Sequence, residues 1–186
     1  MSMDFRACLF PAAALHRRLE TLRPAMYRLA YLWCHDAALA DDLTQDALTK
    51  AVARLGQLRD PDRLRPWLFG ILVNAWRDHL RALRPGEDID ALEETLVCAS
   101  PTPEQQASQA ELVAAMRAAV ARLPVGQRQV IALVDLEECG YAETAAILGI
   151  PVGTVMSRLH RGRAALRAAL AGDAPEALAP HLRLVR

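Results

Sequence analysis

The sequence predicts an all-α protein made of two small helical domains, an N-terminal helix bundle and a C-terminal helix-turn-helix domain of four helices. Alanine, leucine and arginine are abundant, whereas aromatic residues make up only 5%, a composition that favours helices. Apolar residues account for 53% of the 186 residues, which is enough for hydrophobic cores. Charge is unevenly distributed along the chain, and this pattern divides it into domains.

The charge pattern separates two basic blocks by an acidic connector. Residues 1–84 carry 13 basic and 9 acidic residues, residues 85–111 carry 7 acidic residues and no basic one, and residues 112–186 carry 9 and 6. Like charges and two prolines oppose compaction of the connector. We therefore expect an N-terminal domain over 15–84, a flexible linker over 85–110, a C-terminal domain over 111–171 and a tail over 172–186.

In the N-terminal domain, apolar spacing predicts a first helix from Leu15 to Trp33, with a break or kink near Pro24. Asp36 is a suitable N-cap for a second helix, which continues to about Leu55.

A loop follows over residues 56–61, and Asp62 is expected to cap a third helix. Pro66 falls near the start of that helix, where a missing N–H group costs least. Pro85-Gly86 ends the helix and the bundle.

The C-terminal domain is predicted to begin with a helix from about Glu104 to Leu123, and Pro124 starts a second helix that ends near Gly140. Two more helices follow, separated by a turn that begins at Gly149, a residue able to adopt the left-handed conformation that ends a helix. A short helix, a tight turn and a longer helix over 152–170 are typical of a helix-turn-helix.

The last helix carries the signal for nucleic-acid binding. Its inward stripe includes Val155 and Leu159, and no acidic residue occurs between 152 and 170. Its outward face is expected to hold polar and basic side chains at helical spacing, continued by further arginines: Thr154, Ser157, Arg158, Arg161, Arg163 and Arg167. Such a helix fits the major groove of DNA, with arginines placed for phosphates. An arginine-rich solvated surface is the alternative, but the helix-turn-helix pattern favours DNA binding.

Other classes of protein find little support. Basic and acidic residues balance at 22 each, which excludes a polybasic protein, and no apolar run is long enough to span a membrane. Without a nucleophile–base pair, a phosphate-binding glycine loop or metal-ligand spacing, we expect no enzyme, cofactor, metal or small-molecule substrate. The cysteines form no C-x-x-C pair and are expected to be reduced thiols of a cytoplasmic protein: Cys8, Cys34, Cys98 and Cys139. A redox role for Cys34 or Cys139 has no support in the sequence.

DNA binding alone is compatible with an ordinary helix-turn-helix transcriptional regulator. The two-block layout argues against it, because residues 1–84 lack the strand pattern of an effector-binding or receiver domain.

Several motifs together resemble the extracytoplasmic-function (ECF) sigma factors of bacterial RNA polymerase. In the C-terminal domain they are LP-x-x-QR at 123–128, Gly-Tyr-x-Glu at 140–143 and G-x-P-x-GTV-x-SRL-x-R-x-R at 149–163. In the N-terminal domain, residues 41–46 (DDLTQD) resemble the family's EDLVQE helix, and RPWLFGILVN at 65–74 with DHLR at 78–81 resembles its WL…IA.N…D.LR helix. The resemblance covers both domains in the family's order.

The resemblance implies that the chain binds core polymerase and directs promoter recognition and melting. The C-terminal domain would read the minus-thirty-five element as duplex DNA through Thr154, Met156, Ser157, Arg158, His160, Arg161 and Arg163. Met156 departs from the family, which usually has Lys or Arg at this position. A thioether cannot make a bidentate contact with guanine, so an apolar contact to a thymine methyl is one replacement.

The N-terminal domain would by resemblance read the minus-ten element as an opened single strand. The implied surface comprises the loop after the second helix and the helix that follows it, with the residues Arg59, Arg63, Arg65, Asn74, Arg77 and Arg81. Capture of a single strand needs a basic groove and a pocket for a flipped base. Trp67 and Trp76 have the right chemistry for stacking on bases, but their place on the apolar stripe favours core packing.

The resemblance also implies protein partners. The large subunit of core polymerase would be contacted at its clamp and its flap, and the clamp would bind the helix face formed by Asp41, Asp42, Leu43, Gln45 and Asp46. The acidic linker would lie in the RNA channel of the polymerase. An anti-sigma factor that covers the polymerase-facing surfaces is expected as a regulator.

Overall fold

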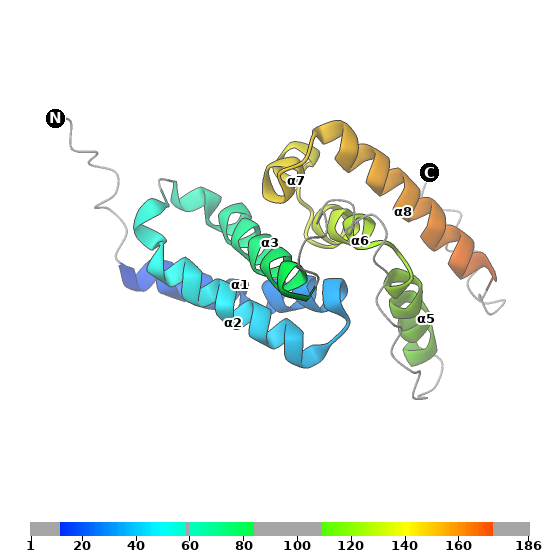
Figure 1. Ribbon diagram of the computed structural model, residues 1–186, viewed down its shortest axis with the longest axis horizontal. Coiled ribbons are helices and arrows are strands. Elements are labelled where there is room, and N and C mark those ends of the chain that lie inside the picture. Colours follow the sequence, from blue (N-terminus) through cyan, green and yellow to red (C-terminus); the bar gives the residue numbers. More distant parts are fainter. Residues whose placement is uncertain (1–11, 59, 84–108, 173–186) are drawn as a thin grey trace.

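A computed structural model describes residues 12–58, 60–83 and 109–172. Within these ranges the chain is helical and contains no strand, and its helices form two groups (Figure 1). The predicted all-α fold with two helical domains is confirmed. The expected linker and tail lie mostly outside the described residues, as do Arg59, Cys8 and Cys98.

The N-terminal domain is a bundle of three long helices, α1 (Ala12–Cys34), α2 (Ala37–Ala53) and α3 (Leu64–Leu83). Their facing sides bury large apolar side chains completely, among them Trp33, Phe69 and Leu72. The break expected at Pro24 is not found, because α1 continues through this proline. Pro24 is itself exposed, so the carbonyl group that loses its helical partner lies near solvent.

Side-chain caps set the starts of the next helices. The Asp36 carboxylate accepts hydrogen bonds from the N–H groups of Ala38 (2.9 Å) and Leu39 (3.1 Å), which confirms the predicted N-cap of α2. Two short 3₁₀ turns, η1 (Leu55–Gln57) and η2 (Pro61–Arg63), connect α2 to α3. The cap predicted at Asp62 is wrong: Asp60 caps the η2 turn by accepting from the N–H of Asp62.

The C-terminal domain contains α5 (Gln109–Ala121), α6 (Val125–Ile131), a π-helical turn η3 (Ala132–Leu136), α7 (Tyr141–Leu148) and α8 (Val152–Gly172). Helices α7 and α8 form the predicted helix-turn-helix. Gly149 ends α7 with φ +66°, in the left-handed region that favours glycine, as the sequence predicts.

Two glycines allow α6 and α8 to pack closely. A Cβ atom on Gly126 of α6 would lie 2.9 Å from the guanidinium carbon of Arg158, and one on Gly162 of α8 would lie 2.6 Å from Cδ1 of Ile131. The absence of these side chains therefore decides how near the two helices come.

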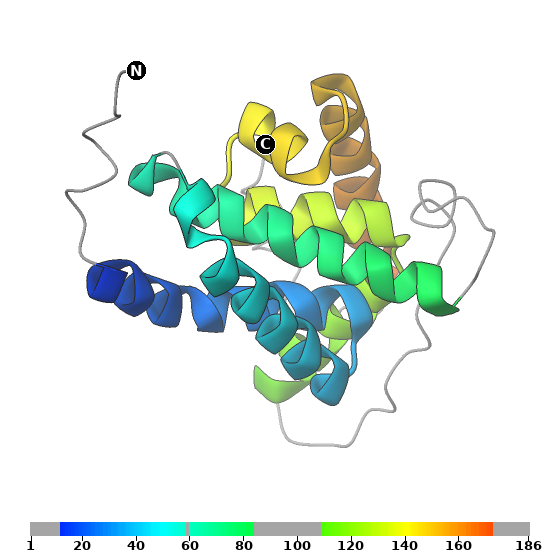
Figure 2. The same ribbon diagram turned by 60° about the vertical axis from the view of Figure 1, so that its left-hand side comes forward.

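The two domains pack directly on each other and share one hydrophobic cluster. Helix α3 lies against α7, and α1 lies against α6, as the two views in Figures 1 and 2 show. Direct contacts between helices therefore hold the two domains together in this arrangement. Among the described helices, none is long and apolar enough to cross a lipid bilayer.

Candidate nucleic-acid interface

The second helix of the helix-turn-helix, α8, presents a short polar and basic face to solvent. Met156, Ser157, His160 and Arg161 are exposed, and Thr154 is half-buried. The Ser157 hydroxyl donates to the Thr154 carbonyl (3.1 Å), and Arg161 Nε donates to the Ser157 carbonyl (3.4 Å). This face is accessible to a duplex, and Arg161 supplies its positive charge.

Arg158 does not lie on this face, and its expected outward orientation is wrong. Its side chain is only 4% exposed and extends over Gly126 of α6. The space above a residue without a side chain admits the guanidinium group into the packing between α6 and α8. Arg158 therefore contributes to the interior of the domain in this structure.

Arg163 is exposed, but its guanidinium group forms an ion pair with an acidic side chain of its own domain. Its guanidinium binds the carboxylate of Asp135 through two nitrogens, one of them Nε at 3.1 Å from Oδ2. This hydrogen bonding raises the pKa of Arg163. A phosphate contact by Arg163 would have to compete with Asp135.

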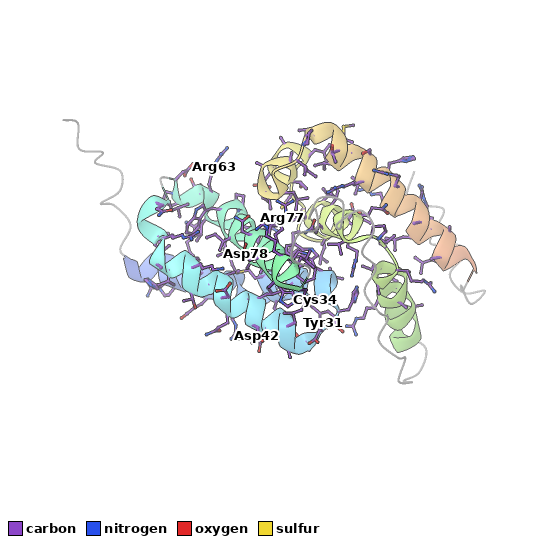
Figure 3. The ribbon with its side chains drawn as sticks, viewed as in Figure 1. Tyr31, Cys34, Asp42, Arg63, Arg77 and Asp78 are labelled. Carbon is purple, nitrogen blue, oxygen red and sulfur yellow. The ribbon has the colours of Figure 1, made fainter. Side chains whose placement is uncertain are left out.

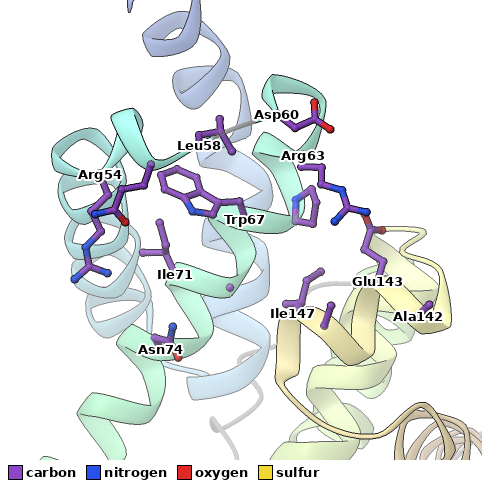
Figure 4. Close-up of a pocket in the computed structure, with 14 residues that line it drawn as sticks. Arg54, Leu58, Asp60, Arg63, Trp67, Ile71, Asn74, Ala142, Glu143 and Ile147 are labelled. Carbon is purple, nitrogen blue, oxygen red and sulfur yellow. The ribbon is translucent and has the colours of Figure 1, made fainter. Parts of the chain in front are cut away.

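A cavity of about 830 Å³ lies between the N-terminal domain and α7 (Figure 4). The N-terminal domain contributes Arg63, Trp67 and Asn74 to its wall, and α7 contributes Glu143 and Ile147. The side chains of Arg63 and Glu143 point toward one another across this space (Figure 4). The cavity thus combines an aromatic face, an amide and an arginine, the chemistry that suits an unstacked base.

The remaining residues of the expected minus-ten surface lie along α3. Arg65 is half-buried and contacts Glu137 of the C-terminal domain, as described below. Arg77 lies on the side of α3 that faces the C-terminal domain (Figure 3). Its Nη1 is 4.0 Å from the point where a Cβ atom on Gly149 would lie. Arg81 is exposed and pairs with Asp78 at 2.9 Å.

The two tryptophans differ in burial. Trp76 is 3% exposed and belongs to the core, as expected, whereas Trp67 is half-buried and lines the cavity. Trp67 also packs against the hydrophobic core, but its exposed part faces the cavity and is accessible to an aromatic ligand.

Helix α2 carries an exposed acidic face. Asp41, Asp42, Gln45 and Asp46 are exposed, and Figure 3 shows Asp42 on the outer side of the helix. Arg23 pairs with Asp41 (3.2 Å) and Lys50 with Asp46 (2.8 Å), so Asp42 is the carboxylate on this face for which no ion pair is found in the described part of the chain. Leu43 is only 5% exposed and packs in the bundle core, which corrects its place on this face.

Sequence reasoning missed the polar contacts between the domains. The Glu137 carboxylate, 5% exposed, accepts from Arg28 of α1 (2.9 Å) and from Arg65 of α3 (2.8 Å). Arg128 of α6 is fully buried, and its Nη1 donates to the Leu32 carbonyl near the end of α1 (3.4 Å). No local pattern marks Glu137 or Arg28, because their partners lie in the other domain.

Two titratable groups near these contacts have shifted pKa values. Burial, assisted by the positive charge of Arg128, lowers the pKa of His35 to about 4, so this histidine is neutral near pH 7. Burial and the nearby carboxylate of Glu143 raise the pKa of Cys139 to about 12, which keeps it a protonated thiol. The thiolate is the reactive form of cysteine, so a thiol with a raised pKa is a poor nucleophile. Cys34 is likewise a free and buried cysteine.

Comparison with known proteins gives matches to both domains in the same order. Residues 19–85 match the family model of sigma-70 region 2, and residues 114–166 match that of sigma-70 region 4. The two helical domains, with a helix-turn-helix in the second, therefore define a sigma factor of the sigma-70 class.

Relatives narrow the class further. The chain is 34% identical to the ECF RNA polymerase sigma factor EcfG of Rhodopseudomonas palustris over 84% of this chain and 85% of EcfG. It is 37% identical to SigM of Mycobacterium tuberculosis over 76% of this chain and 69% of SigM. It is also 37% identical to SigE of Mycolicibacterium smegmatis over 81% of this chain, but spans only 59% of SigE. The chain belongs to the ECF RNA polymerase sigma factor family.

Solved structures agree with this assignment. The sigma factor RpoE in complex with the anti-sigma factor NepR from Bartonella quintana matches with a TM-score of 0.69 at 28% identity, covering 84% of this chain and 96% of RpoE. CnrH in complex with the cytosolic domain of CnrY matches with a TM-score of 0.64 at 29% identity, covering 90% of this chain and 94% of the other. Each match is longer than either domain alone and so includes both.

Proposed function

We propose that the chain is a specificity subunit of bacterial RNA polymerase that directs the core enzyme to promoters, takes part in melting them and catalyses no reaction of its own. It acts in the cytoplasm, on the nucleoid. The observation that carries the proposal is the pairing of a region 2 domain and a region 4 domain in one chain, each with an accessible polar face.

Region 4 is assigned to the minus-thirty-five element as a duplex. The exposed face of α8 supplies Met156, Ser157, His160 and Arg161, and Thr154 lies at its start. The N-terminal part of a recognition helix reaches base edges in the major groove, while arginines contact phosphates. Arg161 is the charged member of this set. Arg163 would add a second positive charge once its ion pair with Asp135 is broken.

Region 2 is assigned to the minus-ten element as a single strand. The cavity holds Trp67 for stacking and Asn74 for hydrogen bonding to a base edge, and Arg63 is placed for the backbone. Arg65, Arg77 and Arg81 extend this basic surface along α3.

The exposed acidic face of α2 is assigned to the clamp of the polymerase large subunit, through Asp41, Asp42, Gln45 and Asp46. Region 4 would meet the flap of the same subunit. An anti-sigma factor is proposed as the regulator, since the matching structure of the sigma factor RpoE is a complex with the anti-sigma factor NepR. The matching structure of CnrH is likewise a complex, with the cytosolic domain of CnrY.

The isolated chain is expected to bind promoter DNA weakly. Few of its basic residues reach DNA, and each phosphate contact contributes a salt-dependent increment with a slope near −0.9. When both domains are held on one core enzyme, the second contact becomes intramolecular, which raises avidity by roughly 10²–10⁴-fold.

Run-off transcription with purified core polymerase on a library of promoter sequences tests the proposal. The expected result is RNA synthesis from new start sites that share two spaced elements. The proposal is overturned if the chain neither binds the core enzyme nor starts transcription. That negative result is the one expected of a helix-turn-helix regulator that acts without being a polymerase subunit. Met116→Ala, at an exposed position of α5 outside the α8 face, the α2 face and the cavity, serves as a control variant that should retain start-site choice.

A further inference from the structure

Glu137 lies where the two domains meet, in a site formed by two arginines of the other domain. We infer that this Arg28–Arg65 site is an anion site on region 2 that Glu137 fills in the free chain. The free chain is thereby held in a closed form in which region 4 excludes a promoter strand from region 2. The exclusion rests on the proposed minus-ten function of region 2, whereas the closure does not.

The geometry of the Arg28–Arg65 site is specific. Arg28 Nη2 lies 2.9 Å from Glu137 Oε1, and Arg65 Nη2 lies 2.8 Å from Oε2, so each carboxylate oxygen has its own guanidinium. Arg65 also donates to the backbone carbonyl of Glu137, and its guanidinium carbon stacks 5.1 Å from the centre of the Phe69 ring. Two converging guanidinium groups repel one another unless an anion lies between them.

The two arginines and the carboxylate come from elements far apart in the sequence. Arg28 is 109 residues and Arg65 is 72 residues from Glu137. Arg28 belongs to α1 and Arg65 to α3, which are fixed in the bundle of region 2, whereas Glu137 follows the η3 turn of region 4. The site would persist on region 2 after the domains separate, but without its carboxylate.

A second carboxylate of region 4 faces the same surface. Glu143 of α7 points toward Arg63 across the cavity that also holds Trp67 and Asn74 (Figure 4). Closure thus pairs one carboxylate with Arg65 and directs a second toward Arg63, where the phosphates of a bound strand would lie. Region 4 and a nucleic-acid strand carry the same sign of charge at this surface and cannot occupy it together.

The interface combines the shared hydrophobic cluster with charged contacts. A second polar contact across the interface is made by Arg128 of region 4, which donates to the Leu32 carbonyl at the C-terminal end of α1. The C-terminal end of a helix favours a cation. Glu137 is the buried partner, so loss of an arginine charge leaves its carboxylate uncompensated, and loss of the carboxylate leaves two guanidinium groups facing each other. Either change favours the form in which the remaining charge reaches water. Changes at Glu137 should therefore shift the equilibrium toward the open form.

The distance between the domains is measured in the full-length chain by single-molecule fluorescence transfer. Dyes are attached through non-natural side chains at Thr49 of α2 and His160 of α8, both exposed, so that the cysteines stay untouched. Glu137→Gln and Arg28→Gln are each expected to move most molecules from high to low transfer efficiency. Far-UV circular dichroism shows whether both variants keep their helices.

The chain offers a matched control in the same segment. Asp135 also binds an arginine through its carboxylate, but Arg163 lies in the same domain. Asp135→Asn removes an ion pair of similar chemistry without touching the interface, so it should retain the transfer efficiency of the unmodified chain. If Glu137→Gln and Arg28→Gln keep that efficiency as well, closure by Glu137 is overturned.

Binding of a fluorescein-labelled oligothymidylate tests the exclusion separately. A closed population lowers the apparent affinity in proportion to the fraction that is open, so Glu137→Gln should bind this single strand about tenfold more tightly. Asp41→Asn removes one negative charge from an ion pair within region 2, away from the interface and from the assigned DNA surfaces, and should leave the affinity unchanged. Opening without a gain in affinity would overturn the exclusion. If the open variants also failed to start transcription with core polymerase, the proposed function would fall while the closure remained.

Discussion

The two domains are both helical, yet their interiors are built differently. Region 2 buries large apolar side chains, including Trp33, Phe69 and Leu72, and Thr44 is its one buried polar residue among those described. Region 4 buries five polar or charged residues in the described part of the chain: Arg128, Gln129, Glu137, Thr144 and Arg158. The interior of region 2 is therefore almost wholly apolar, whereas region 4 combines an apolar core with buried polar groups and close helix packing.

The tryptophans allow the two domains to be followed separately. All three, Trp33, Trp67 and Trp76, belong to region 2, so tryptophan fluorescence reports the unfolding of that domain. Far-UV circular dichroism reports the helices of both domains. Comparing the two signals during denaturation shows which domain a substitution affects.

The largest effect is expected from Leu72→Ala in the core of region 2. Leu72 is fully buried, and removal of a buried leucine side chain costs about 2–5 kcal/mol through lost burial and the cavity left behind. The tryptophan transition in guanidinium chloride should move to much lower denaturant. Leu83→Ala on the same helix, where the leucine is 65% exposed, should leave the transition nearly unchanged.

The pH dependence of stability tests the boundary between the domains. Burial and the charge of Arg128 lower the pKa of His35 to about 4, from 6.5 in the unfolded chain. The unfolded state therefore binds the proton first, and this contribution to stability is complete above pH 6.5 and lost as the pH falls toward 4. Because His35 is only half-buried, solvent screening limits the full loss to about 1–3 kcal/mol.

His35→Gln isolates this contribution, because it removes the titrating group. Between pH 6.5 and 4 the free energy of unfolding should fall less steeply in the variant than in the unmodified chain. Parallel curves for the two proteins would show that His35 does not titrate differently on unfolding.

Gly126→Ala addresses the packing particular to region 4. The added Cβ would lie 2.9 Å from the Arg158 guanidinium carbon, so the arginine must move, at a cost of about 1–3 kcal/mol. The circular dichroism transition of region 4 should shift while the tryptophan transition changes little. Gly153→Ala, which meets no atom within 4 Å, is the control and should be neutral or slightly stabilising.

The smallest change in stability, below about 0.5 kcal/mol, is expected from Arg161→Ala on the exposed face of α8. Its effect should appear instead in promoter binding by the holoenzyme, where loss of one phosphate contact lowers the slope of log affinity against log salt by about 0.9. Arg158→Ala should instead destabilise region 4, because Arg158 is buried, and should leave the salt slope unchanged. Equal salt slopes for Arg161→Ala and the unmodified chain would remove Arg161 from the DNA interface.

Local signals in the sequence were sufficient for several elements of the fold. Asp36 caps α2 and Gly149 ends α7, because both effects involve only neighbouring backbone groups. Asp62 was predicted to cap the third helix, but the η2 turn before α3 moves the cap to Asp60. A residue-by-residue pattern does not distinguish a helix start from a short 3₁₀ turn that leads into it.

The candidate site was less accessible to the same reasoning. Spacing placed Arg158 on the outward face of its helix, and the family resemblance placed Leu43 on the clamp-binding face, yet both are buried. For a side chain beside the inward stripe of a helix, the neighbouring helix decides the outcome. For Arg158 that neighbour is Gly126, whose missing side chain leaves room for a guanidinium group.

From its sequence alone the protein is a two-domain helical sigma factor, since helix propensity, apolar periodicity, capping residues and family motifs all act over short stretches of chain. Only the tertiary structure decided that Glu137 meets Arg28 and Arg65, that α7 closes over the cavity of region 2, and which arginines of α8 reach solvent. These contacts join residues far apart in the chain, and their formation depends on how whole helices pack. No local pattern encodes that packing.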